Sequence, residues 1–216
     1  PASDVLTVTM PCFGTGERTR GNAEELSLLL GTDFRCVDIA ASAEQHLKDI
    51  GHSLDNYDVT YENAQARERT QVLMDLANQS GGIVIGTGDL SEVALGWSTY
   101  NGDHMSMYGV NCTVPKTLVR FIVRYYADTC ANERLAAVLY DILDTPVSPE
   151  LVPSKPGEIN QRTEDILGTY ELHDFFLYYM IRGGYSPDKL FRIARLSFAG
   201  KYDDEYIKKT LTLFCR

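Results

Sequence analysis

The sequence lacks the features that mark several classes of protein. No apolar run reaches the length of a membrane-spanning helix, so we expect no membrane partner. No cluster of lysine and arginine stands out and the formal net charge is −10, which argues against nucleic acid. The four histidines do not stand at metal-ligand spacing, and no Ser or Cys occupies a nucleophile elbow. We therefore expect neither a structural zinc site nor a covalent nucleophile.

Cysteine is present but unpatterned. The five cysteines are odd in number and form no C-x-x-C pair. This usage is typical of reduced thiols, so we expect a cytoplasmic protein without a disulfide framework. The chain begins at Pro1, and a buried strand is expected only four residues later. We therefore expect these 216 residues to be a fragment of a longer chain.

In the first part of the sequence, short β-branched apolar runs alternate with helical periodicity. Strands are expected at residues 5–10, 34–39 and 82–86. Helices are expected at residues 22–30, 42–50 and 58–78. Gly31 should end the first helix, Ser42 should cap the second, and the third strand is apolar enough to be covered on both faces. The alternation predicts an α/β fold with a parallel sheet and flanking helices.

The second part of the sequence is mainly helical. Periodicity fails over residues 97–115, which predicts a long ordered loop. A polar, proline-rich stretch up to about Leu167 should run over the surface. Helices are expected at residues 116–130, 132–143, 171–182, 187–199 and 203–214. We divide the chain into an α/β part, residues 1–96, and a mainly helical part, residues 116–216.

A glycine-rich turn, Gly86-Thr-Gly-Asp-Leu-Ser-Glu92, joins the third expected strand to a helix. Free backbone N–H groups and the positive end of the helix dipole favour a phosphate at such a place. Glu92 would there be suited to a Mg²⁺ ion that bridges phosphates. Asp89 and Glu92 also fit a simple helix cap, and the spacing alone leaves both interpretations open.

Asn63 and Arg67 lie four residues apart and therefore share a face of the expected helix 58–78. Such a pair suits a polar ligand, because the guanidinium fork matches a carboxylate or a phosphate. The alternative is a solvated face with loosely paired charges, formed by Glu62, Arg67, Glu68 and Arg69.

The expected loop holds further candidates. Trp97 and Tyr100 are suited to stacking on a planar heterocycle, and Asp103 to accepting a hydrogen bond from a ribose hydroxyl or an amide. The alternative is a local plug of buried aromatic rings. After the loop, Lys116 stands in the first turn of a helix, where its charge opposes the helix dipole. It is a candidate for a ligand phosphate, although a solvated lysine fits the same pattern.

Taken together and in this order, the segments resemble the NAD synthetase family, in its glutamine-dependent form. The resemblance is carried by YENAQARERTQ, GTGDLSEVALGWSTYNGDHMSMYGVN and VPKTLVR. TMPCFGTGERTRGNAEEL, LDTPVSPELVP and EDILGTYELHDFFLYYMIRGG extend it over nearly the whole chain. The combination is far more specific than any one segment, and it favours ligand binding over each alternative above.

The resemblance implies an ATP-pyrophosphatase type of ligase with an adenine nucleotide alpha hydrolase-like fold. In that reaction deamido-NAD is adenylated by ATP with Mg²⁺, and ammonia from a glutaminase domain outside this chain then displaces AMP. The implied ATP or phosphate contacts are Thr87, Arg67, Lys116 and Ser148. The implied deamido-NAD contacts are Asn63, Glu92, Trp97, Tyr100 and Asp103, with Glu92 also at the metal.

Three parts of that family's pattern are missing from the sequence. These are the Ser-Gly-Gly-x-Asp-Ser loop with its central strand, the glutaminase domain, and a basic segment after Arg216. We therefore expect a fragment of a homo-oligomeric enzyme that is inactive alone. Two other functions stay open: a non-catalytic nucleotide-binding or oligomerisation module, and another ATP-pyrophosphatase amidotransferase such as GMP synthetase.

Overall fold

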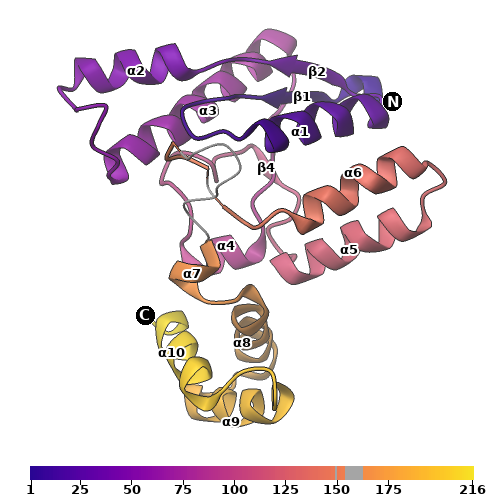
Figure 1. Ribbon diagram of the computed structural model, residues 1–216, viewed down its shortest axis with the longest axis vertical. Coiled ribbons are helices and arrows are strands. Elements are labelled where there is room, and N and C mark those ends of the chain that lie inside the picture. The colour runs from indigo at the N-terminus through magenta and orange to yellow at the C-terminus, as the bar shows by residue number, and fades with distance from the viewer. Residues whose placement is uncertain (149, 154–162) are drawn as a thin grey trace.

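The computed structural model describes residues 1–148, 150–153 and 163–216. Expectations for residues 149 and 154–162, in the proline-rich stretch, lie outside the described residues. Figure 1 shows three layers along the long axis: an α/β layer, a middle layer, and a helical bundle at the C-terminus. Strands alternate with helices in the first two layers, so the α/β class is confirmed.

The first layer is a pair of parallel strands with three helices. Its elements are η1 (Ala2–Asp4), β1 (Leu6–Thr9), α1 (Glu17–Leu30), β2 (Asp33–Cys36), α2 (Ala40–Asp49) and α3 (Val59–Ser80). The register pairs Leu6 with Asp33 and Thr9 with Cys36. Gly31 ends α1 in the left-handed conformation at φ 71°, as expected. Ser42 is not a cap, because α2 begins two residues earlier, where the Asp38 carboxylate accepts the Ala40 N–H.

The middle layer holds a second, separate pair of parallel strands. They are β3 (Ile85–Gly86) and β4 (Tyr108–Gly109), and β4 lies inside the stretch expected to be loop. The prediction of a third strand buried on both faces was wrong. Ile83 and Ile85 are 63% and 49% exposed, because β3 pairs with the short β4 and not with the β1–β2 pair. The parallel sheet is therefore in two pieces.

Three helices complete the middle layer: α4 (Leu90–Leu95), α5 (Lys116–Thr129) and α6 (Glu133–Asp144). The Asn132 side chain caps α6 by accepting two backbone N–H groups. Apolar side chains of α5 and α6 pack against Leu26 and Leu29 of α1. The mainly helical part of the chain is thus packed on the α/β layer.

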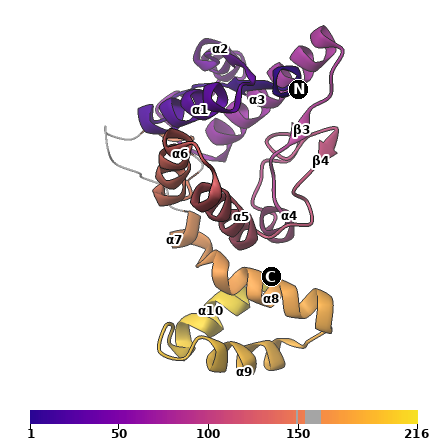
Figure 2. The ribbon, with the colours of Figure 1, turned by 90° about the vertical axis from the view of Figure 1, so that its right-hand side faces the viewer.

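The last layer contains α7 (Thr163–Leu167), α8 (Tyr170–Gly183), α9 (Pro187–Ser197) and α10 (Asp204–Phe214). Its core is formed by Leu172, Phe176, Leu190, Ala194, Ile207 and Leu211. Figure 2 shows α8 as the element that faces the middle layer. At the described end of the proline-rich stretch, α7 lies on the surface as expected with residues 164–166 exposed, but Thr163 and Leu167 are buried. Among the described residues, no helix has the length and apolarity that a membrane crossing requires.

Candidate functional site

A cavity of about 380 Å³, called the main cavity below, lies where α3, α4 and the loop after α4 meet. Its wall also includes Val147, Ser148 and Leu151, together with Thr163 of α7 and Tyr170 of α8. Five of the nine ligand residues expected from the sequence line it: Asn63, Glu92, Trp97, Asp103 and Ser148. Segments far apart in sequence therefore converge on one site.

One stripe of α3 forms a wall of the main cavity. Val59, Glu62, Ala66 and Arg69 follow the three- and four-residue spacing of a helix face. The face of α3 beside this stripe is buried, with Gln65 fully covered and its amide donating to the Leu151 carbonyl at 2.8 Å. This packing fixes the rotation of α3 and so decides which side chains face the cavity.

The loop after α4 is braced from within and from α3. The Thr99 hydroxyl donates to Asn63 Oδ1 at 2.8 Å, and the Thr99 N–H donates to Asp103 Oδ1 at 2.7 Å. Arg67 Nε donates to the Tyr100 carbonyl at 3.2 Å, but the Tyr100 side chain is 75% exposed. Arg67 and Tyr100 support the loop from outside the main cavity.

Lys116 is held between two carboxylates of the α4 start. Its Nζ lies 2.7 Å from Asp89 Oδ2 and 2.8 Å from Glu92 Oε1. Burial lowers the pKa of Lys116, but hydrogen bonds to both carboxylates outweigh it, so the pKa is raised and the ammonium stays charged. Asp89 and Glu92 also form the capping box considered from the sequence. The two carboxylates thus balance the lysine at the start of α5.

A second cavity of about 300 Å³ adjoins the first and contains Lys116 in its wall. Val147 and Tyr170 line both cavities. Tyr170 is 3% exposed, and the Lys116 ammonium lies 5.1 Å from its ring centroid. Burial, with Glu92 and Asp89 nearby, raises the pKa of the Tyr170 hydroxyl, which therefore remains protonated. Sequence reasoning missed this residue, although it lies in the EDILGTYELHD segment.

A buried carboxylate that sequence reasoning also missed connects α8 to this site. Asp174 Oδ2 accepts the Thr117 N–H at 2.9 Å, and Oδ1 accepts the Ser91 hydroxyl. Ser91 Oγ in turn accepts the Lys116 N–H at 2.8 Å. Pro115, at the N-cap of α5, has no side-chain cap. Asp174 supplies that cap from α8 and so holds α4 and α5 together.

Two further residues lie elsewhere than the sequence suggested. Thr87 is exposed and is not among the residues that line either cavity. Arg69, which the sequence placed among loosely paired surface charges, lines the main cavity. Within the described part of the chain, no group of three or more His, Cys, Asp or Glu side chains is placed to hold a metal ion.

Comparisons with known proteins agree on one family. The NAD synthase family model matches residues 2–200. The curated glutamine-dependent NAD(+) synthetase of Mycobacterium leprae is 49% identical over 196 residues, which are 88% of this chain and 29% of that protein. The chain thus spans about a third of the length of such relatives.

Solved structures show the same fold. The NMN synthetase of Francisella tularensis is 25% identical with a TM-score of 0.67, over 92% of this chain and 76% of that one. A glutamine-dependent NAD(+) synthetase of Cytophaga hutchinsonii is 20% identical with a TM-score of 0.71, over 97% of this chain and 32% of that one.

Proposed function

The chain belongs to the NAD synthase family, and we propose that it forms the synthetase part of a longer ligase that converts deamido-NAD to NAD. The Mycobacterium leprae relative is named a glutamine-dependent NAD(+) synthetase. Ammonia would then come from a glutaminase domain outside these residues. The nicotinate carboxylate would attack the α-phosphate of ATP and release pyrophosphate, and ammonia would then displace AMP from the adenylate. Residues 1–96 and 116–216 would act as one ligase domain.

The convergence of three segments in the main cavity carries the proposal. Asn63 of α3, Glu92 of α4 and the loop from Trp97 to Asp103 surround one space. Trp97 offers a ring for stacking, while Asn63 and Asp103 offer polar contacts to a ribose or an amide. We assign these residues and Tyr100 to deamido-NAD. The protein's contribution would be positioning and charge stabilisation, because the resemblance implies no covalent step on the chain.

We assign the ATP phosphates to residues around the main cavity and the second cavity. Ser148 lines the main cavity, and Lys116 lies between the two cavities beside Glu92. Thr87 stands at the glycine turn before α4, and Arg67 on α3 is exposed like Thr87. Both exposed residues would reach ATP from outside the main cavity.

Glu92 is the proposed magnesium ligand. Its Oε1 contacts Lys116 at 2.8 Å and its Oε2 accepts the Asp89 N–H at 3.2 Å, so its charge is already shared. Mg²⁺ is usually bound by one or two carboxylates together with substrate phosphates and water. Glu92 therefore fits a metal ion held jointly with ATP, and a bound ion would supply charge neutralisation at the phosphates.

Fluorescence of the single tryptophan tests the proposal, because Trp97 lines the main cavity. Titration of the 216-residue chain with deamido-NAD should quench the fluorescence of Trp97. Deamido-NAD should bind more tightly than NAD, which carries an amide in place of the nicotinate carboxylate. The Trp97→Phe variant provides the blank. AMP release by this chain alone would contradict the expected need for the rest of the enzyme. Absence of both quenching and calorimetric heat with deamido-NAD and ATP would instead favour a scaffold function.

The same titration separates related substrates. Preference for xanthosine monophosphate would favour a GMP synthetase type of reaction. Preference for nicotinate mononucleotide would favour amidation of the mononucleotide. The similarity to the Francisella tularensis NMN synthetase, over 92% of this chain, makes the mononucleotide the second candidate.

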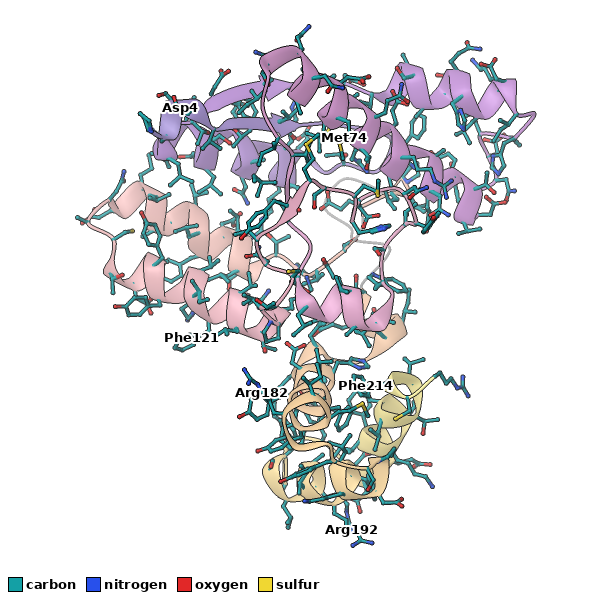
Figure 3. All side chains as sticks on the ribbon, turned by 180° about the vertical axis from the view of Figure 1, so that it is seen from behind. Asp4, Met74, Phe121, Arg182, Arg192 and Phe214 are labelled. Carbon is teal, nitrogen blue, oxygen red and sulfur yellow. The ribbon has the colours of Figure 1, made fainter. Side chains whose placement is uncertain are left out.

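We propose a homo-oligomer that uses an apolar face of α5. Its exposed side chains are Leu118, Phe121, Ile122, Tyr125 and Tyr126. Figure 3 shows Phe121 pointing away from the rest of the molecule. A patch of this kind is typical of an interaction site. All five cysteines are unpaired, which supports the cytoplasmic location that we also propose.

A further inference from the structure

Arg69 brings a positive charge to the main cavity. It stands at the C-terminal end of the α3 stripe, about 15 Å along the helix axis from Val59 at 1.5 Å per residue. Its Nε donates to the Met10 carbonyl at 3.3 Å. Met10 directly follows β1, so the guanidinium is fixed at the carboxyl end of that strand.

The guanidinium of Arg69 forms no salt bridge in the described part of the chain, where the charges of Asp103 and Glu150 act on it only from a longer distance. No carboxylate lies within 4.0 Å of it there, whereas Arg18, Arg134 and Arg195 each pair with one. Burial lowers the pKa of Arg69, and an arginine remains charged even so. A partly desolvated charge without a direct ion-pair partner is unfavourable, so an anion entering the cavity would gain by binding there.

The place and geometry of Arg69 indicate the kind of anion. In open α/β sheets, ligands bind outside the carboxyl ends of the strands, where this residue lies. With Nε held by Met10, the two terminal nitrogens remain as donors, and that fork suits the oxygens of a phosphate. The carboxylates of Glu92 and Asp103 line the same cavity without a salt bridge to Arg69, and each would repel a phosphate placed directly beside it.

We propose that Arg69 binds a phosphate group of the nucleotide that occupies the main cavity. This rests on the proposed function in one respect, that the ligand is a nucleotide. The phosphate belongs either to ATP or to the dinucleotide, and the chemistry of recognition is the same. Arg69 then fixes the position of the ligand along the α3 stripe, while Trp97 and Asn63 contact its bases and sugars.

The test compares ligands with and without phosphate. Dissociation constants of the 216-residue chain are measured by Trp97 fluorescence and by calorimetry. The ligand pairs are ATP with adenosine, and deamido-NAD with nicotinate riboside. Arg69→Ala should weaken one of the phosphate ligands about 10- to 100-fold and leave its nucleoside unchanged. Arg69→Lys keeps the charge but not the two-pronged guanidinium, so its dissociation constant should lie between those of the wild type and Arg69→Ala. The pair that responds identifies the source of the phosphate.

Arg192→Ala is the matched control, because Arg192 is exposed on α9, far from α3 (Figure 3). It should change none of the four constants. The proposal would be overturned if Arg69→Ala weakened a nucleoside as much as its nucleotide, or if it weakened neither ATP nor deamido-NAD. A wild-type chain that binds neither ATP nor deamido-NAD would overturn it as well. Failure of the proposed function looks different: deamido-NAD and NAD would bind equally, while the phosphate-specific loss at Arg69 would persist.

Discussion

Replacing Asp174 by alanine removes the carboxylate that joins α8 to α4 and α5. The Thr117 N–H and the Ser91 hydroxyl then lose their acceptor. Asp174 is 7% exposed and Ser91 is 1% exposed, so water cannot freely replace it. Each hydrogen bond to a charged group contributes about 1.5–3 kcal/mol, while removing the buried charge recovers part of its desolvation. We expect the free energy of unfolding to fall by about 2–4 kcal/mol.

A loss of that size lowers the melting temperature by about 5–15 °C, since 1 kcal/mol corresponds to about 2–4 °C for a domain of this length. Asp174→Asn keeps the shape of the side chain and one acceptor oxygen, so its free energy of unfolding should fall by about half as much as that of Asp174→Ala. Because Ser91 also holds the Lys116 N–H, the Asn variant should bind deamido-NAD more weakly even at temperatures where it is fully folded.

Thermal unfolding followed by circular dichroism measures the stability, and Trp97 fluorescence measures the binding. Asp188→Ala is the control, because Asp188 is an exposed acid of the same bundle and should change stability by less than about 1 kcal/mol. An Asp174→Ala chain that melts with the wild type would refute the role of this carboxylate in holding α4 and α5.

Three further predictions concern other parts of the fold. Arg18 holds the pKa of Asp141 at about 2, below its usual 3.8. The stability that ionised Asp141 contributes is therefore fully present above pH 4 and is lost as the pH falls toward 2. Acid unfolding of Asp141→Asn should lack that step. Gly14→Ala would place a Cβ 2.5 Å from the Glu150 carbonyl oxygen, so the urea midpoint should fall by the equivalent of about 1–3 kcal/mol. Phe121→Glu should convert the oligomer to a monomer in analytical ultracentrifugation, and a monomeric wild type would contradict the α5 interface.

Helix boundaries were predictable from sequence where a local signal sets them. Gly31 ends α1 in the left-handed conformation, and Asp89 with Glu92 starts α4 through a capping box. Strand pairing has no such local signal. β3 finds its partner at Tyr108, inside a stretch without periodicity, and only the folded chain brings the two together. That is why the sequence predicted a parallel sheet lacking its central strand, but not that β3 would pair with a strand inside the expected loop.

The α3 face shows the same limit at the site. The four-residue spacing correctly puts Asn63 and Arg67 on neighbouring positions, but it cannot say where the cavity lies. Packing of Gln65 turns Ala66 toward the cavity. At about 100° per residue, Arg67 is then about 100° away from the centre of that face and Arg69 only about 60°. The cavity therefore receives Arg69, and Arg67 contacts the loop instead.

The C-terminal bundle completes the site, although it lies far along the chain from α4 and the start of α5. Asp174 reaches Ser91 across 83 residues of sequence and Thr117 across 57. Tyr170, one turn earlier on α8, has the Lys116 ammonium over its ring and lines both cavities. Glu92 and Lys116 carry the proposed phosphate chemistry. The capping box of Asp89 and Glu92 starts α4, while the hydrogen bonds that end on α8 cap the start of α5 and hold it to α4. The bundle thus helps to position these two charges. Substitutions at the start of α8 should therefore weaken ligand binding more than equally destabilising substitutions in the apolar core of the bundle, which lies away from the site.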